Sequence, residues 1–310
     1  MQTHQDPYPS RVHDQPAILP RTEPVVYAAD AAPVAALTEA QRKTYQDDGF
    51  LFVPELFTPE EVQGLYREMQ SMRSRYAAEG RDGIARAEVI SERDSGEVRS
   101  IFHVHESSPV FSRLVRDPRL LNVAREILGS EVYIHQSRIN YKPGFQGKEF
   151  YWHSDFETWH VEDGMPAMRA LSCTLLLTDN DEHNGPLMLI PGSHREFIAC
   201  VGATPEENYK RSLKQQEIGV PDGDSLTRLA QSRGIVSCKG RAGSVIFFDC
   251  NTMHGSNGNI TPFPRSNAFF VYNSIANQLQ APAPGLQPRP EYIAVRTQVA
   301  ALTPQALALV

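Results

Sequence analysis

The spacing of hydrophobic and polar residues divides the chain into a helical first part and a strand-rich second part. Thr38 caps a short helix that ends near Gly49. The run Thr58-Pro59-Glu60-Glu61 predicts a second helix, because it combines a capping Thr, Pro at the first helical position and Glu three residues after the cap. We expect this helix to reach about Ala78 and to be stopped by Gly80.

Two further short helices are predicted after Ser108-Pro109 and Asp117-Pro118. From residue 131 onward the sequence consists of short apolar runs separated by polar turns, which is typical of strands. A polar insert at 200–233 is expected to be helical. The predicted strands are 50–53, 131–142, 149–155, 169–178, 186–190, 244–250 and 266–274. This order predicts a mainly β fold with flanking helices, whose core is a double-stranded β-helix of the jelly-roll, cupin-like kind.

The pattern favours one domain with an extension at each end. Residues 1–36 contain six prolines and no sustained periodicity, so we interpret them as an arm that lies over the domain or is partly flexible. Residues 37–295 are expected to form the single domain, and 296–310 a C-terminal tail.

Composition excludes several classes of protein. The net charge is −7 and there is no Lys/Arg-rich run, which argues against a nucleic-acid partner. No apolar stretch approaches the roughly 18 residues that span a bilayer, so no membrane association is expected. Four cysteines are scattered without a CxxC pair, which is typical of reduced thiols in a cytoplasmic protein.

The candidate chemistry lies in the strand-rich part. His153 and Asp155 form a His-x-Asp pair on a predicted strand, where residues two apart point the same way and can converge on one metal ion. His254, just after an apolar strand, is the best candidate for a second histidine ligand. Two histidines and one carboxylate leave open positions on a non-haem Fe(II). Arg265, before the next strand, suits a dicarboxylate whose other end chelates the iron.

Other interpretations stay open at this point. A His-x-Asp pair by itself can be a strand histidine bonded to its neighbour, and His194 is the main competitor of His254 for the distal position. His254 is favoured because Arg265 follows it by eleven residues, while His194 follows a turn and has no Arg at similar spacing.

Several motifs together resemble one known family. They are Trp152–His160, Glu162–Pro166, Asn184-Gly185, Pro191–His194 and His254–Asn259. From about residue 38 to 295 the chain is similar to the ectoine hydroxylases, in the phytanoyl-CoA dioxygenase-like branch of the Fe(II)/2-oxoglutarate-dependent dioxygenases.

The resemblance implies a role for each member of a larger set of residues. It places iron at His153, Asp155 and His254. It implies 2-oxoglutarate contacts from Lys142, Arg265 and Ser256, with Asn140, Phe150 and Ser172 in the same pocket. It implies ectoine contacts from Gln136, Thr158, Trp159 and Arg289, with Phe248 and Phe269 as aromatic walls. The alternative to these binding roles is that Phe248 and Phe269 are ordinary core residues and that Arg289 is a solvated side chain.

The expected activity is therefore hydroxylation of ectoine to 5-hydroxyectoine by Fe(II), 2-oxoglutarate and O₂, with release of succinate and CO₂. The resemblance also suggests a homodimer. Two alternatives remain: the same iron chemistry on another small metabolite such as a free amino acid, and a non-enzymatic cupin-like metal or metabolite sensor. A halogenase is disfavoured, because a halide would need the position of Asp155.

Overall fold

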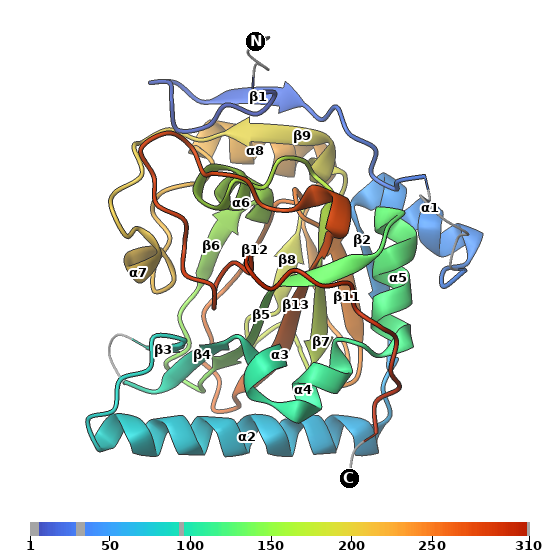
Figure 1. Cartoon of the computed structure of the whole chain (residues 1–310), viewed down its shortest axis with the longest axis vertical. Coiled ribbons are helices and arrows are strands. Elements are labelled where there is room, and N and C mark those ends of the chain that lie inside the picture. The colour runs from blue at the N-terminus through green and yellow to red at the C-terminus, as the bar shows by residue number, and fades with distance from the viewer. Residues whose placement is uncertain (1–5, 29–34, 93–95, 309–310) are drawn as a thin grey trace.

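Two antiparallel sheets form the core of the molecule (Figure 1). The computed structural model describes residues 6–28, 35–92 and 96–308. The larger sheet has the order β2 (Phe50–Val53), β11 (Val245–Asp249), β7 (Ala170–Leu176), β13 (Arg265–Ser274), β5 (Val132–Lys142), β4 (Val98–Phe102) and β3 (Val89–Ser91). The smaller sheet has the order β10 (Val236–Cys238), β8 (Leu187–Leu189), β12 (His254–Ser256) and β6 (Phe150–His153). The predicted mainly β fold with flanking helices is confirmed.

Alternation along the strands of the larger sheet explains its two buried faces. In β7, Leu171, Cys173 and Leu175 belong to a cluster that also contains side chains of α2 (Pro59–Arg81) and α5 (Pro118–Leu128). Leu176 belongs instead to a cluster with Leu187 of the smaller sheet. Because strand side chains alternate between faces, one face of β7 packs on helices and the other on the second sheet. The polar side chains on that second face are therefore enclosed between the sheets.

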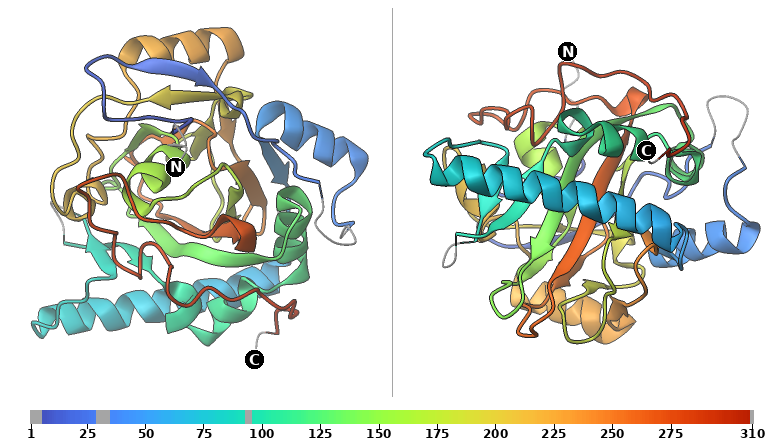
Figure 2. Two further views of the ribbon diagram at one scale, coloured as in Figure 1. Left: turned by 45° about the horizontal axis from the view of Figure 1, so that its top comes forward. Right: turned by 90° about the horizontal axis from the view of Figure 1, so that it is seen from below.

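Helices cover the outer face of the larger sheet (Figure 2). The long α2 crosses it, and α4 and α5 lie beside α2. The helices are α1 (Glu39–Asp48), α2 (Pro59–Arg81), α3 (Val104–Ser107), α4 (Pro109–Leu114), α5 (Pro118–Leu128), α6 (Asp155–Asp163), α7 (Tyr209–Ser212) and α8 (Gly223–Arg233), with 3-10 turns η1 (Ser193–Arg195) and η2 (Ile275–Asn277). None of the helices in the described ranges is long and apolar enough to cross a membrane.

The helix boundaries follow the capping signals, with two corrections. Thr38 and Thr58 both form capping boxes, and Gly49 ends α1 in the left-handed region, as predicted. The predicted stop at Gly80 is wrong, because α2 continues to Arg81 and ends at Asp82. A glycine inside a helix costs only about 1 kcal/mol, which a long helix tolerates. The insert at 200–233 is only partly helical, since α7 and α8 occupy less than half of it.

Both chain extensions pack against the domain. In the arm, β1 (Ala17–Pro20), a strand that the sequence did not indicate, pairs with β9 (Glu196–Ala199). In the tail, Leu302 is buried and its N–H donates to the carbonyl of Val132. The segments 6–28 and 296–308 are therefore bonded to the surface of the sheets and helices.

Candidate metal centre and active site

Three metal-ligating side chains converge where β6, β12 and α6 meet. β12 pairs with β6 so that His254 is the cross-strand partner of His153. Asp155, the first residue of α6, lies between them: its Oδ1 is 3.8 Å from His153 Nε2 and its Oδ2 is 3.9 Å from His254 Nε2. One ligand atom from each residue lies within 4.8 Å of the others. This donor set fits Fe(II) with open coordination positions.

Neighbouring groups fix the orientation of all three side chains. The Nδ1–H of His153 donates to the carbonyl of Tyr151 at 2.6 Å, and that of His254 to the carbonyl of Thr252 at 2.9 Å. Since a carbonyl can only accept, both rings keep their Nε2 lone pair for a metal. Ser172 Oγ donates to Asp155 Oδ2 at 3.1 Å. The triad is thus oriented in the way that metal ligands usually are.

The electrostatics favour the protonation states that a metal needs. Burial, and then the neighbouring His254, lower the pKa of His153 to about 4, so its imidazole is neutral at physiological pH. Burial would raise the pKa of Asp155, but His254, His153 and Arg138 outweigh it and the pKa is lowered. A neutral imidazole and an ionised carboxylate are the forms that bind metal.

The prediction that His153 and Asp155 converge because both lie on one strand is wrong. Asp155 does not lie on a strand: β6 ends at His153, and Ser154 caps α6 by accepting a hydrogen bond from the N–H of Glu157. The two side chains converge because the chain turns from strand into helix at Ser154. The pattern Ser-x-x-Glu over 154–157 is a capping signature that could have located this start.

The structure brings His254 into the site and leaves His194 out. Across the described parts of the chain, the one three-residue group with metal-ligand spacing contains His153, Asp155 and His254. His194 is fully buried elsewhere, and its Nε2–H donates to the carbonyl of Gln46. It therefore has a packing role at the turn that follows β8.

Buried cations lie beside the triad. Lys142 and Arg265 are cross-strand partners on β5 and β13, and each is 2% exposed. Their hydrogen bonds go to neutral groups: Lys142 Nζ donates to Ser256 Oγ at 3.0 Å, and Arg265 Nη1 to the carbonyl of Gly185 at 2.6 Å. Arg265 Nε is buried and has no partner within the described ranges. Burial lowers the pKa of Arg265 to about 10 and also lowers that of Lys142. Two buried cations that are bonded to neutral groups favour the binding of an anion beside them.

Residues predicted for 2-oxoglutarate line one small recess next to the triad. It is bounded by both metal-site histidines and by Asn140, Phe150, Ser256, Arg265 and Phe269. Lys142 does not line the recess itself, but its Nζ donates to the hydroxyl of Ser256, which does. Ser172 is the exception, since its hydroxyl is bonded to Asp155. The recess, with an unpaired guanidinium nitrogen at its wall, fits a carboxylate ligand.

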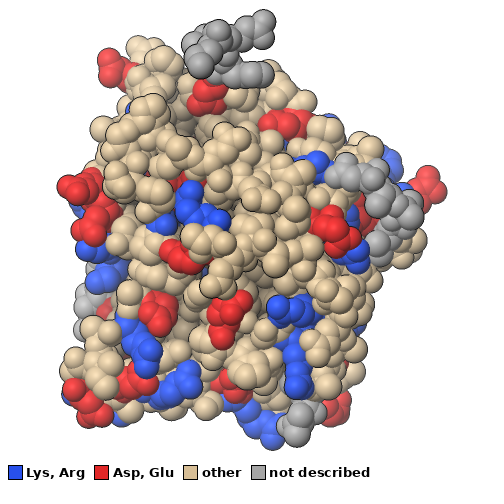
Figure 3. Space-filling model, in the orientation of Figure 1, with Lys and Arg blue, Asp and Glu red and all other residues tan. Residues whose placement is uncertain are grey.

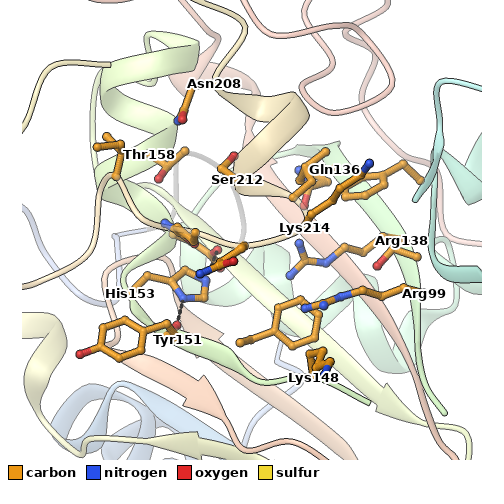
Figure 4. Close-up of a pocket in the computed structure, with 18 of the residues that line it drawn as sticks. Arg99, Gln136, Arg138, Lys148, Tyr151, His153, Thr158, Asn208, Ser212 and Lys214 are labelled. Atoms are coloured by element: carbon orange, nitrogen blue, oxygen red, sulfur yellow. Dashed lines mark hydrogen bonds and ion pairs between the residues drawn. The ribbon is translucent and has the colours of Figure 1, made fainter. Parts of the chain in front are cut away.

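A larger cavity of about 410 Å³ is lined by His153 and Asp155 as well. Gln136, Thr158, Trp159 and Arg289 line it, so four of the residues predicted for ectoine lie together. The segment 208–218 forms one wall: Figure 4 shows Ser212 and Lys214 on one side of the cavity and His153 and Tyr151 on another.

The remaining predicted wall residues are placed differently from one another. Phe248 is 1% exposed and packs in the core between the two sheets, with its ring 5.0 Å from that of His254. Phe269 lines the recess. Trp159 is 3% exposed and belongs to a core cluster with Phe156 and Met165, although one edge of it borders the cavity.

Comparison with known proteins assigns the family. The model of the phytanoyl-CoA dioxygenase (PhyH) family matches residues 45–267. An ectoine dioxygenase of Bordetella bronchiseptica is 60% identical over 97% of this chain and 96% of its own length. The crystal structure of EctD from S. alaskensis with 2-oxoglutarate and 5-hydroxyectoine has a TM-score of 0.87 at 48% identity, covering 99% of this chain and all of that one. A further structure of that EctD has bound Fe.

The chain belongs to the ectoine dioxygenases of the phytanoyl-CoA dioxygenase family. A more distant 2-oxoglutarate-dependent carbocyclase, SnoK, is 18% identical with a TM-score of 0.59, and therefore shares the fold alone. The ectoine dioxygenase relatives match almost the full chain, so the resemblance covers the arm as well as the sheets.

Sequence reasoning missed several polar residues of this ectoine dioxygenase. Arg138 is half-buried and lines both the recess and the cavity, and its Nε is buried with no partner among the described residues. Its place on the same strand face as Gln136 and Asn140 was the available signal. Asp163 accepts two hydrogen bonds from Arg289 at 2.7 and 2.6 Å. It lies within the motif Glu162–Pro166, but its pairing could not be predicted because 126 residues separate the two.

Proposed function

We propose that this protein hydroxylates ectoine to 5-hydroxyectoine, consuming 2-oxoglutarate and O₂ and releasing succinate and CO₂. The observation that carries the proposal is the juxtaposition of a His153–Asp155–His254 group with a recess whose cations, Lys142 and Arg265, are bonded only to neutral groups. Curated relatives named ectoine dioxygenase, and an EctD solved with 2-oxoglutarate and 5-hydroxyectoine, support the choice of substrate.

Iron would be held by His153 Nε2, His254 Nε2 and the carboxylate of Asp155. Bound there, Fe(II) would supply the activation of O₂, coupled to oxidative decarboxylation of 2-oxoglutarate, that places one oxygen atom into a C–H bond. The chain's own contribution is to orient both imidazoles through their Nδ1–H bonds to backbone carbonyls and to orient Asp155 through the hydroxyl of Ser172.

The distal carboxylate of 2-oxoglutarate would bind Arg265, with Lys142 reinforcing the positive field through Ser256. Arg265 Nε is the donor left unpaired, and a carboxylate would satisfy it. Asn140 and Phe150 would close the sides of the same recess. A charge-assisted contact in a buried site is worth about 1.5–3 kcal/mol.

Ectoine, a cyclic amidinium carboxylate, would occupy the larger cavity. Trp159 offers an aromatic ring whose face can bind the cation, and Thr158 and Gln136 offer polar atoms. Arg289 Nε and Nη2 are held by Asp163, so a contact with the ectoine carboxylate would use Nη1. The wall formed by 208–218 would exclude water from the reacting carbon.

A cupin-like sensor is the candidate from another class, and it would need the metal ligands but not the cationic recess. Hydroxylation of a free amino acid would use both. Arg265 and Lys142 argue against the sensor, while the ectoine dioxygenase relatives argue against the second substrate.

We also propose a homodimer and a cytoplasmic location. Three large apolar side chains from two adjacent loops are exposed, Phe145 by 67%, Ile260 by 84% and Phe263 by 70%, and burial in a dimer would remove them from water. Charges of both signs are interspersed over the face in Figure 3, which favours a small-molecule enzyme over a nucleic-acid binder. Analytical ultracentrifugation of the wild type and Phe263→Ser tests the dimer.

The activity is tested by loading purified protein with Fe(II) and measuring succinate with ectoine, with proline and without a primary substrate. We expect succinate to form in step with hydroxylated ectoine, identified by NMR, and Asp155→Asn to abolish both. Equal succinate formation with all three mixtures would refute substrate coupling, and product only from proline would support the amino-acid alternative.

A further inference from the structure

Arg11, in the N-terminal arm, lies buried against the helix that carries part of the active site. Its side chain is 2% exposed, although it comes from a segment rich in proline and polar residues. Its backbone φ is +61°, a region that L-residues other than glycine and asparagine rarely adopt. Such a conformation persists where the surroundings hold the residue. What holds Arg11 is a set of charged hydrogen bonds.

The guanidinium joins two carboxylates of α6. Nε and Nη2 donate to the two oxygens of Glu157 at 2.9 and 2.7 Å, and Nη1 donates to Glu162 at 2.6 Å. Both glutamates are almost fully buried, so without a cation their charges would be uncompensated. Between them in α6 lie Thr158 and Trp159, which line the cavity.

The same guanidinium contacts the base of the segment that forms the cavity wall. At one end of this segment, Nη1 donates to Thr204 Oγ1 at 2.9 Å. At the other end, Gly219 lies so close that a Cβ there would be 2.3 Å from Arg11 Nη2. Asn208 Nδ2 adds a bond to Glu162 at 2.9 Å. Residues 208–218 between these points line the cavity (Figure 4).

We propose that Arg11 is a positioning residue for substrate binding, which fastens the cavity wall 204–219 to α6. The arm is then part of the active site, although Arg11 is absent from the cavity lining. The substrate named in the test rests on the proposed function, whereas the fastening of the wall does not. In the proposed arrangement 2-oxoglutarate would occupy the recess lined by Arg265 and Ser256, which do not line the cavity, so the effect should be specific to the primary substrate.

The test compares Arg11→Gln, which removes the bridging cation, with Thr204→Val, which removes only the contact to the wall and leaves both carboxylates neutralised. The matched control is Arg228→Gln, which breaks an ion pair on α8 with Glu196, away from the cavity. Thermal unfolding and iron content are measured for each variant. Lys210, Arg211 and Lys214 lie within the wall and provide trypsin sites, of which Lys210 and Arg211 are largely exposed.

We expect Arg11→Gln and, less strongly, Thr204→Val to accelerate tryptic cleavage at these three sites, read by mass spectrometry. We also expect the KM for ectoine to rise, roughly ten- to a hundredfold for Arg11→Gln, while the KM for 2-oxoglutarate and the iron content stay near wild type. Arg11→Lys should recover part of the loss, because one amine can pair with only some of the partners.

Unchanged cleavage in both variants would overturn the proposal, as would an equal rise in both KM values. Should Arg11→Gln fail to fold, Thr204→Val decides by the same two readouts. If the wild type does not turn over ectoine, the proposed function fails, and the cleavage comparison alone then decides whether Arg11 fastens the wall.

Discussion

Arg265 is a buried cation with one guanidinium nitrogen unpaired, and this gives the clearest reason to expect an anionic cosubstrate. We predict that Arg265→Ala raises the KM for 2-oxoglutarate roughly ten- to a hundredfold and the KM for ectoine much less, because a charge-assisted contact is lost from one substrate only. Steady-state kinetics with each substrate varied in turn checks this. Equal effects on both would mean that Arg265 supports the sheet.

Trp159 is a residue for which the core and the binding interpretations both have support, since it packs with Phe156 and also borders the cavity. If its π-face binds the amidinium, Trp159→Phe should retain more ectoine affinity than Trp159→Leu, by about 1 kcal/mol. Calorimetric titration of the anaerobic holoenzyme measures this. Equal affinity of the Phe and Leu variants would make Trp159 a packing wall.

Residue-level prediction grouped side chains that the structure also brings together when they are close in sequence: His153 and Asp155 are two residues apart. Lys142 lies on a predicted strand, and Arg265, expected just before a strand, is the first residue of β13. Residue-level prediction failed for Arg11, Arg138 and Asp163. Arg11 and Asp163 have partners more than a hundred residues away, and no local pattern can reveal such a contact.

At the level of elements, caps and turn residues were the reliable signals. Thr38, Thr58 and Gly49 each mark a real helix boundary. The short strand β1 was not predicted, because it depends on pairing with β9, almost 180 residues later. The strand predicted over 149–155 was cut short by the cap at Ser154, since a local hydrogen bond there competes with strand geometry.

Gly49 offers a test of this level. It has a φ of +81°, and a Cβ there would lie 2.3 Å from Nδ1 of His194. Gly49→Ala should lower the free energy of unfolding by at least about 1–2 kcal/mol. Gly80→Ala is the matched control: it lies in α2 with nothing within 4 Å, so it should be neutral or stabilising by up to about 1 kcal/mol. Urea unfolding of both variants decides, and similar losses would contradict this explanation.

At the level of the whole molecule, the arm and the tail are bonded to a single pair of facing sheets, and we propose that residues 37–295 form one domain. The arm contacts α6 through Arg11, which is bonded to Glu157 and Glu162. It contacts the end of β11 through Arg21, which pairs with Asp249 at 2.8 Å. The sequence could assign the sheets and the three residues of the candidate metal group. For the arm it left open whether the segment lies over the domain or is partly flexible, because its composition does not reveal its distant partners.

Stability should depend on pH through buried histidines that are not ligands. Burial lowers the pKa of His194 to about 4 and that of His105 to about 3. The unfolded chain binds a proton at each site below about pH 6.5, while the native state does not until near 4, so stability falls as the pH drops through this window. For His194 the loss is on the order of 3 kcal/mol. Urea unfolding between pH 7 and 4.5 gives the free energy of unfolding at each pH. It should fall less steeply with decreasing pH in His194→Gln than in the wild type. An equal fall in both proteins would mean that His194 does not cause the pH dependence.

The most direct test of the central claim is the fate of labelled oxygen. Wild-type protein loaded with Fe(II) is given ectoine, 2-oxoglutarate and ¹⁸O₂, and the products are analysed by mass spectrometry. We expect one labelled atom in succinate and one in 5-hydroxyectoine, in equal amounts, with one CO₂ released for each. Labelled succinate accompanied by unchanged ectoine would contradict the central claim, because the site would then decarboxylate 2-oxoglutarate without acting on this substrate.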